Sequence, residues 1–305
     1  MTILKTTNLT KKFGKFTALN GVNMEVNRGE VYGFIGPNGA GKSTTIRILL
    51  GILKASEGEA KIFGKDAWKD AVEIHKRVSY VPGDVNLWPN LTGGEVIDLF
   101  TKLRGGNNKT RREELIEKFN LDPSKKCRTY SKGNRQKVAL VSAFSSDADL
   151  YILDEPTSGL DPLMERVFQE CVIDAKRAGK SVLLSSHILS EVERLCDKVG
   201  IIRQGEIIES GTLKELRHLT RTHLLLETKQ EISGLNSLEG VHEIETKDEA
   251  LSLQVDAENL DSVMQHVSKF GVIRLESSPP KLEDLFMRHY EGAKNITDAG
   301  DGGAS

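Results

Sequence analysis

The segment Gly-Pro-Asn-Gly-Ala-Gly-Lys-Ser at residues 36–43 gives the strongest indication of fold in this chain. It fits the pattern G-x-x-x-x-G-K-[ST] at every position. Its members are Gly36, Pro37, Asn38, Gly39, Ala40, Gly41, Lys42 and Ser43. An apolar run at residues 31–35 precedes the segment, and a helical pattern from Thr44 to Leu53 follows it. A glycine-rich turn between a strand and a helix lets backbone N–H groups surround phosphate oxygens, so the sequence predicts a nucleoside triphosphate site.

Two side chains at the end of this segment suit a triphosphate and its metal ion. Lys42 would place a positive charge at the β- and γ-phosphates, and the Ser43 hydroxyl is a hard oxygen suited to Mg²⁺. We expect the residues from Gly36 to Thr44 to bind the nucleotide. The segment alone does not distinguish a kinase, a GTPase and an ATPase.

Two carboxylates follow an apolar run at residues 150–153. Asp154 and Glu155 should therefore lie at the carboxyl end of a buried strand, where open α/β sheets bind ligands. Asp154 suits the surroundings of a Mg²⁺ ion, and Glu155 could orient or deprotonate the water that attacks the γ-phosphate. The alternative is a pair of carboxylates exposed to solvent at the end of a strand.

His187 follows another apolar run, at residues 182–184, after Ser185 and Ser186. We expect it at the carboxyl end of a further strand, where it could donate a hydrogen bond to the γ-phosphate and hold the attacking water in line. The alternative is a histidine with a structural role.

The first 215 residues alternate short apolar runs with helical segments, which is typical of a mainly parallel sheet flanked by helices. Strands are predicted at residues 31–35, 77–81, 150–153 and 181–185. Apolar residues between positions 94 and 119 recur every three to four residues, which predicts an inserted helical subdomain.

A different pattern begins after a short predicted helix at residues 213–218. Strands are predicted at residues 224–228, 241–245, 251–255 and 272–275, with a helix at residues 260–270. We expect a second, small α+β domain here. Residues 292–305 are mostly small or polar, so we expect a disordered tail.

Composition limits the classes of protein that fit. At about 150 residues per domain, the 305 residues suggest two domains. The net charge of −2, without long runs of one sign, disfavours nucleic acid as a partner. We find no run of about 18 apolar residues and no signal-peptide pattern, so we expect a cytosolic chain. The three cysteines form no CxxC pair, and we interpret them as reduced, structural thiols.

The order of the motifs resembles that of the ATP-binding subunit of an ATP-binding cassette (ABC) transporter, over about residues 3–216. Residues 130–134 are similar to the signature of that family, residues 158–161 to its D-loop, and His187 to its switch histidine. The resemblance implies a RecA-like P-loop NTPase core over residues 1–216, with an antiparallel β portion. It also implies a helical subdomain, at about residues 90–145, that docks on a membrane permease.

The signature of the family is Leu-Ser-Gly-Gly-Gln, whereas this chain has Tyr-Ser-Lys-Gly-Asn. Ser131 and Gly133 retain the two positions that, by resemblance, offer a hydroxyl and an N–H group to the γ-phosphate bound by the other subunit. An ordinary helix N-cap at Ser131 is the alternative. In the D-loop, the resemblance makes Asp161 a further nucleotide-binding residue.

Two further positions are interpreted through the same resemblance. After the strand at residues 77–81 the family usually has a glutamine that reaches Mg²⁺, but this chain has Gly83 followed by Asp84. We hypothesise that Asp84 or a water takes its place as a ligand. Phe13 occupies the position of the aromatic residue that stacks on adenine, with Phe16 as a rival, and either ring could instead belong to the core. Selectivity between ATP and GTP stays open.

The trailing residues 217–291 resemble the short C-terminal extension of some exporter-type cassettes. The segment Pro-Lys-Leu-Glu-Asp-Leu-Phe at residues 280–286 carries this likeness, and its spacing predicts an amphipathic packing helix. We expect a dimerisation or regulatory domain without a catalytic set.

These features predict an ATPase subunit that dimerises on ATP and Mg²⁺ and powers export through a separate membrane permease. We expect such a subunit at the cytoplasmic face of the membrane, bound through that permease. One alternative is a soluble cassette ATPase that acts on ribosomes or DNA, and another is a small-molecule kinase with a P-loop. The sequence does not identify the exported substrate.

Overall fold

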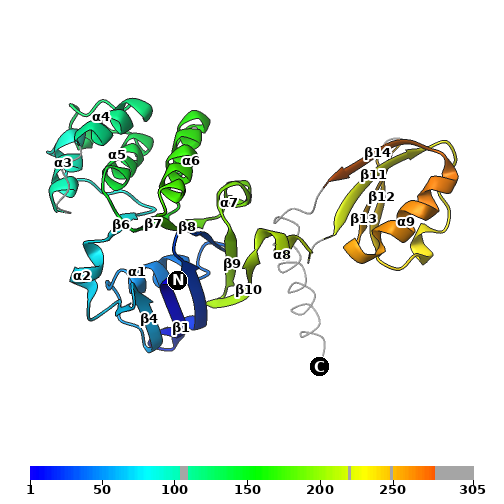
Figure 1. The fold of residues 1–305 in the computed structure, drawn as a ribbon, viewed down its shortest axis with the longest axis horizontal. Coiled ribbons are helices and arrows are strands. Elements are labelled where there is room, and N and C mark those ends of the chain that lie inside the picture. Colours follow the sequence, from blue (N-terminus) through cyan, green and yellow to red (C-terminus); the bar gives the residue numbers. More distant parts are fainter. Residues whose placement is uncertain (104–108, 219–220, 248–249, 279–305) are drawn as a thin grey trace, which may run out of the picture. The chain divides into compact units, whose positions relative to one another are not determined.

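The computed structural model describes residues 1–103, 109–218, 221–247 and 250–278, and it divides the chain into two compact units (Figure 1). The first unit is Met1–Ser210 and the second is Gly211–Ser305, so the division falls just before the expected boundary at residue 216. The expected helix at residues 280–286 and the expected tail at residues 292–305 lie outside the described residues.

A six-stranded sheet forms the centre of the first unit, in the order β10-β9-β3-β8-β7-β6. The strands are β3 (Val31–Ile35), β6 (Val78–Val81), β7 (Leu150–Asp154), β8 (Ser181–Ser186), β9 (Lys198–Arg203) and β10 (Glu206–Thr212). From β9 to β6 all neighbouring strands are parallel. Strands β3, β7 and β8 are buried along their whole length, which explains their continuous apolar runs. The four predicted strands are confirmed.

Helices pack around this sheet. The helices of the first unit are α1 (Lys42–Leu49), α2 (Ala71–His75), α3 (Gly93–Leu103), α4 (Lys109–Lys118), α5 (Lys132–Phe144), α6 (Pro162–Arg177) and α7 (Leu189–Leu195). Figure 1 shows α3, α4 and α5 grouped together, with α6 beside them. Helix α3 begins at a capping box, in which the Thr92 N–H donates to Glu95 Oε2 at 2.6 Å and the Glu95 N–H donates to Thr92 Oγ1 at 3.1 Å. The predicted helical subdomain is confirmed.

A second, antiparallel sheet contains the N-terminus. Its order is β2-β1-β4-β5, with β1 (Thr2–Phe13), β2 (Phe16–Asn27), β4 (Glu57–Ile62) and β5 (Lys65–Asp66). Buried side chains of this sheet, such as Leu4 and Leu19, belong to the same hydrophobic core as Phe34 of β3 and Leu49 of α1. The antiparallel β portion implied by the resemblance is therefore present, and it shares one core with the central sheet.

The second unit is a small α+β domain, as predicted. Its antiparallel sheet has the order β12-β13-β11-β14, with β11 (Thr222–Thr228), β12 (Val241–Lys247), β13 (Ala250–Val255) and β14 (Val272–Ser278). Helix α8 (Leu213–His218) precedes the sheet, and α9 (Leu260–Val267) precedes β14. Leu224, Leu253 and Val263 belong to a core of its own.

Two further expectations concern membranes and thiols. Within the described part of the chain, no helix combines the length and the hydropathy needed to cross a bilayer. Cys127, Cys171 and Cys196 are buried and form no disulfide. Burial raises the pKa of the Cys171 thiol to about 11, which fits the interpretation of a structural thiol.

Candidate active site

The phosphate loop joins β3 to α1 and requires glycine at two positions. A Cβ atom on Gly36 would lie 2.3 Å from the backbone oxygen of Ile202, which belongs to the neighbouring strand β9. Gly41 has a φ of 118°, and a Cβ atom there would lie 2.7 Å from Leu19 Cδ2. The loop is thus held between β9 and β2, and the N-terminus of α1 carries no acidic residue in its first turn. Because the helix itself contributes no carboxylate at this end, its first N–H groups are suited to bind an anion.

Lys42 is buried beneath the loop, with 5% of its side chain exposed. Its Nζ atom donates hydrogen bonds to the Gly36 oxygen at 2.6 Å and to the Pro37 oxygen at 3.2 Å. Burial lowers the pKa of Lys42, while the charges of Glu155 and Asp154 oppose this. The ammonium group is therefore desolvated, and a triphosphate would offer it a stronger partner than backbone carbonyls.

Three predicted catalytic residues lie in one row. Glu155 Oε1 lies 3.7 Å from Lys42 Nζ, and Glu155 Oε2 lies 3.5 Å from His187 Nδ1. Lys42 follows β3, Glu155 follows β7 and His187 follows β8. These three strands are parallel neighbours in the sheet, and their carboxyl ends share one edge of it. The order of the strands therefore brings together groups that are far apart in the sequence.

The backbone at Glu155 adopts an unusual conformation. Its φ is 47°, in the left-handed region that non-glycine residues rarely adopt. The Glu155 N–H donates to the Ser185 oxygen at 2.9 Å, and the Glu155 oxygen accepts from the Ser158 N–H at 3.1 Å. These bonds hold the strained turn and direct the carboxylate toward the phosphate loop and His187.

Asp154 and Ser43 fit a hard cation such as Mg²⁺. Asp154 ends β7 with 6% exposure, and its Oδ1 atom is buried without a hydrogen-bond partner among the residues that the structure describes. Burial raises the pKa of Asp154, and the neighbouring Ser185 and Ser43 hydroxyls oppose this rise. A buried carboxylate oxygen with no partner, beside a serine hydroxyl, offers the oxygen ligands that Mg²⁺ prefers.

The segment after β6 lies against Asp154, but Asp84 is on its outer side. A Cβ atom on Gly83 would lie 3.2 Å from the backbone oxygen of Asp154. Asp84 is exposed, and its Oδ2 atom accepts a hydrogen bond from Asn86 Nδ2 at 3.4 Å. A role for Asp84 as a metal ligand stays a prediction.

Ser131 and Gly133 lie at the start of α5, packed on the loop that follows Glu155. The Ser131 Oγ atom caps the helix by accepting from the Asn134 N–H at 3.3 Å. A Cβ atom on Gly133 would lie 2.4 Å from the Gly159 oxygen, and Lys132 Nζ donates to Ser158 Oγ at 2.7 Å. The N-cap alternative therefore describes the local geometry, and contact with a nucleotide of another subunit stays a prediction.

Asp161 has a structural function that we did not predict. Its Oδ1 atom accepts hydrogen bonds from the N–H groups of Leu163 at 3.1 Å and Met164 at 3.0 Å, which caps α6. An aspartate before Pro162 is a sequence signal for a helix start, so this cap could have been found. Nucleotide contact by Asp161 stays a prediction.

Phe13 and Phe16 pair across the hairpin between β1 and β2. Their exposed fractions are 47% and 66%, so the alternative that they belong to the core is wrong for both. Strand β2 also contacts the phosphate loop through Leu19 and Gly41, and Lys11 Nζ lies 4.9 Å from the centre of the Phe13 ring. The hairpin thus adjoins the loop with two exposed aromatic rings, and stacking on a base stays a prediction.

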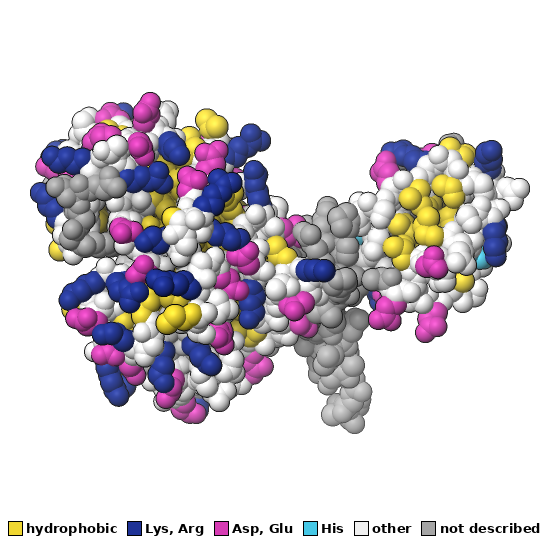
Figure 2. Space-filling view, viewed as in Figure 1, with side chains coloured by type: hydrophobic (Ala, Val, Ile, Leu, Met, Phe, Trp, Pro, Cys, Tyr) yellow, Lys and Arg dark blue, Asp and Glu magenta, His cyan; other side chains and the backbone are white. Residues whose placement is uncertain are grey.

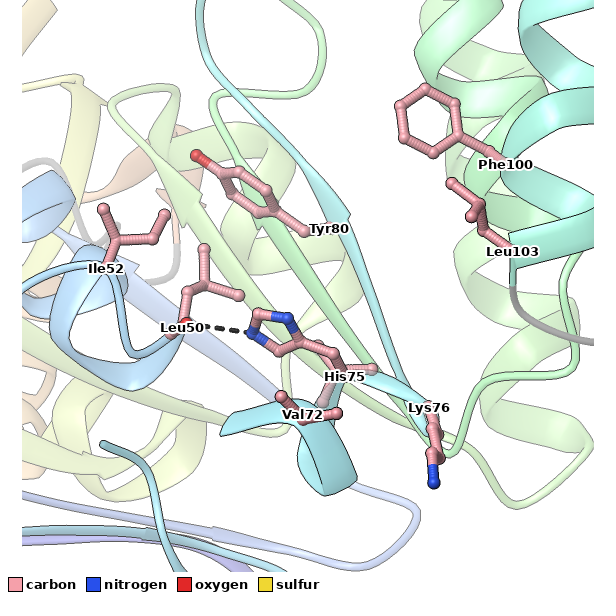
Figure 3. A pocket seen from close by; sticks show the side chains of 9 residues that line it. Leu50, Ile52, Val72, His75, Lys76, Tyr80, Phe100 and Leu103 are labelled. Carbon is pink, nitrogen blue, oxygen red and sulfur yellow. Dashed lines mark hydrogen bonds between the residues drawn. The ribbon is translucent and has the colours of Figure 1, made fainter. Parts of the chain in front are cut away.

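An apolar pocket of about 440 Å³ lies elsewhere on the first unit, and the motifs gave no sign of it (Figure 3). Its lining includes Ile52, Val72, Tyr80 and Phe100, and His75 Nε2 lies 2.9 Å from the Leu50 oxygen. In Figure 3, Phe100 and Leu103 face it from α3, opposite the other side chains. Figure 2 shows apolar side chains over α1 and α2, beneath a row of Lys and Arg side chains.

Comparisons with known proteins agree with the motifs. Residues 19–158 match the family model for ABC transporters, and residues 211–290 match that for the C-terminal domain of DrrA1-3-like ATP-binding proteins. The bacitracin transport ATP-binding protein BcrA of Bacillus licheniformis is 32% identical over 306 residues, which cover 95% of this chain and 98% of that protein.

Solved structures show the same likeness for the first unit. A structure of the ATP-binding subunit of an ABC transporter has a TM-score of 0.67 and 34% identity, over 71% of this chain and 92% of that one. A dimeric cassette in a post-hydrolysis state, bound to ADP and Pi, has a TM-score of 0.63 and 25% identity, over 69% of this chain and 99% of that one.

Proposed function

The chain belongs to the family of ABC transporter ATP-binding proteins, and from this premise we propose that it hydrolyses ATP to drive export through a separate membrane permease. The observation that carries the proposal is the row formed by Lys42, Glu155 and His187 beside the phosphate loop. A triphosphate bound at that loop would have its terminal phosphate next to a cation, a carboxylate and an imidazole.

Each of these side chains has a separate task in the proposed reaction. Lys42 leaves the carbonyls of its own loop and neutralises charge on the β- and γ-phosphates. Glu155 orients the attacking water and accepts its proton while the water oxygen bonds to the γ-phosphorus. The bond between that phosphorus and the oxygen bridging it to the β-phosphate breaks, which releases ADP. His187 donates a hydrogen bond to the γ-phosphate and keeps the water in line.

Ser43 and Asp154 are the residues that would hold Mg²⁺. When bound, the ion neutralises charge on the phosphate oxygens. The buried Oδ1 atom of Asp154, for which the described part of the chain offers no hydrogen-bond partner, supports this assignment.

We propose that a second copy of the chain completes the site. The start of α5, with the Ser131 hydroxyl and the Gly133 N–H, is suited to an anion because α5 carries no acidic residue in its first turn. Its contacts with Gly159 and Ser158 tie it to the loop that carries Glu155. A nucleotide held by one copy and contacted by the other would therefore couple dimerisation to hydrolysis.

The apolar pocket in Figure 3 is the surface that we assign to the permease. Ile52, Val72 and Leu103 border it with exposed fractions of 58%, 78% and 72%, which is high for large apolar side chains. An apolar segment of a membrane protein would cover them. This contact would place the chain at the cytoplasmic face of the membrane, as a peripheral subunit.

Product analysis tests the proposed reaction. The purified chain, given ATP and Mg²⁺, should release inorganic phosphate in an amount equal to the ADP formed. Transfer of the phosphate to a small-molecule acceptor, with no free phosphate, would contradict an ATPase and favour a kinase.

A further inference from the structure

Glu191 is a buried carboxylate that the proposed reaction does not use. It lies on α7 and is 4% exposed. Its Oε2 atom accepts a hydrogen bond from Ser186 Oγ at 2.7 Å. Its Oε1 atom is buried too and has no hydrogen-bond partner in the described ranges of the chain. Burying a carboxylate away from water costs free energy, so stability alone does not account for this residue.

Ser186 connects Glu191 to the histidine of the active site. The Ser186 Oγ atom that donates to Glu191 also accepts a hydrogen bond from the Ile188 N–H at 3.0 Å. These two bonds fix the backbone on both sides of His187, whose Nδ1 atom lies 3.5 Å from Glu155 Oε2. A change at the Glu191 carboxylate would therefore move the turn that carries His187.

Helix α7, which carries Glu191, is tightly packed on the central sheet. It packs directly on β3 at Gly33, where an added Cβ atom would lie 2.8 Å from Val192 Cγ1 and 2.9 Å from Cys196 Sγ. The absence of a side chain at Gly33 thus lets the helix sit against the sheet. Because the helix is held against the sheet, we expect loss of the Ser186–Glu191 bond to shift the turn at His187 rather than the helix.

The same carboxylate also faces the loop of the catalytic glutamate. The Thr157 hydroxyl, two residues after Glu155 and itself buried, stabilises the charged form of Glu191. Glu191 therefore neighbours both the turn that carries His187 and the loop that follows Glu155.

On the basis of the proposed ATPase function, we propose that Glu191 is a positioning residue for hydrolysis. Through Ser186 it sets the turn that aligns His187 with Glu155, and its charge adjusts how firmly that turn is held. It touches neither the nucleotide nor the attacking water.

The surroundings of Glu191 make its charge sensitive to pH near neutrality. Burial raises the pKa of Glu191 to about 7, and the Ser186 and Thr157 hydroxyls partly oppose this. The other titratable groups that face it are the Glu165 carboxyl of α6, which raises its pKa further, and the buried Cys196 thiol. Since a charged acceptor forms the stronger hydrogen bond, the turn should be held more firmly above about pH 7.

A double-mutant cycle on the full chain tests the proposal. We would measure kcat, KM and ATP affinity for Glu191→Ala, Ser186→Ala, the double variant and Glu191→Gln. Glu193→Gln is the matched control, because it removes a carboxylate from the same helix outside the buried group. Single alanine variants should lower kcat about ten- to a hundredfold through misalignment, with ATP affinity changed less than about twofold. The double variant should resemble the single ones.

Glu191→Gln supplies a second readout that does not depend on the alanine variants folding. Its amide oxygen can still accept from Ser186, so kcat should be mostly restored, but kcat should vary less than in the wild type between about pH 6 and pH 8. Wild-type kcat in Glu191→Ala, losses that multiply in the double variant, or an unchanged pH profile in Glu191→Gln would each overturn the proposal. Failure of the wild-type chain to hydrolyse ATP would instead reject the proposed function.

Discussion

The Nζ atom of Lys42 lies 3.7 Å from the Oε1 atom of Glu155. The ammonium group that would bind the phosphates therefore faces the carboxylate that would orient the attacking water. ATP must compete with this contact and with the hydrogen bonds from Lys42 to the Gly36 and Pro37 oxygens. The buried ammonium group of Lys42 should therefore interact more strongly with a triphosphate than with the backbone oxygens of the loop.

Replacing Lys42 by alanine should abolish ATP binding, because the loop then lacks its positive charge. Isothermal titration with ATP and Mg²⁺ measures this. Lys61→Ala is the control, since the pair of Lys61 with Glu59 lies at the surface, where such pairs contribute little. Wild-type ATP affinity in Lys42→Ala would contradict the assigned role of the lysine.

Replacing Glu155 by glutamine should stop turnover and leave ATP binding intact. The amide retains the shape of the side chain but accepts no proton from water, and we expect kcat to fall by at least about a hundredfold. With ATP and Mg²⁺ this variant should form a stable dimer, as measured by size-exclusion chromatography with light scattering. If the variant stays monomeric when loaded with ATP, the proposal that a second copy completes the site is wrong. If it hydrolyses ATP at the wild-type rate, the role assigned to Glu155 is wrong.

The sequence predicted the parts of the site that depend on local motifs. The strand at residues 31–35 has the predicted bounds, and Glu155 and His187 each follow a strand of the parallel sheet, as their preceding apolar runs predicted. Their distance from Lys42 could not be predicted, because it depends on how Gly36 and Gly41 let the loop pack against β9 and β2.

Other features were missed because they arise from tertiary packing. Glu191 is a charged residue on a helix, and only the structure shows that it faces the sheet side rather than solvent. The apolar pocket combines side chains such as Ile52, Tyr80 and Leu103, which come from separate segments without a common pattern. Both features depend on the arrangement of elements, which local periodicity does not specify.

Replacing Asp84 by alanine tests whether this residue is the substitute for the missing glutamine. If Asp84 ligates Mg²⁺, the concentration of Mg²⁺ that gives half-maximal hydrolysis should rise about tenfold or more. Asn86→Ala is the control, because it removes the hydrogen bond to Asp84 and leaves the carboxylate in place. An unchanged Mg²⁺ dependence in Asp84→Ala would reject the hypothesis and leave a water as the substitute.

Replacing Glu191 by glutamine should make folding less sensitive to pH. The pKa of Glu191 is raised from 4.5 to about 7, so the folded state retains a proton that the unfolded state releases. Deprotonation of this group therefore lowers the free energy of unfolding of the wild type as the pH rises above about 4.5, and the loss is complete above about pH 7. Between pH 5 and pH 8 the loss is on the order of 2 kcal/mol. Thermal unfolding should show that the glutamine variant gains most over the wild type at pH 8, and a gain that is equal at both pH values would contradict the shifted pKa.

Replacing Gly133 by alanine should impair turnover through the loop that carries the catalytic glutamate. The added Cβ atom would lie 2.4 Å from the Gly159 oxygen, and because that atom belongs to the backbone, the loop after Glu155 must shift. Overpacking of this kind costs about 1–3 kcal/mol, and the resulting misalignment should lower kcat about tenfold or more. Lys132→Ala is the control, since it removes the hydrogen bond to Ser158 without adding bulk, and its kcat should fall less than about threefold. Equal losses in the two variants would show that the hydrogen bond, rather than the close approach of Gly133 and Gly159, couples α5 to the glutamate.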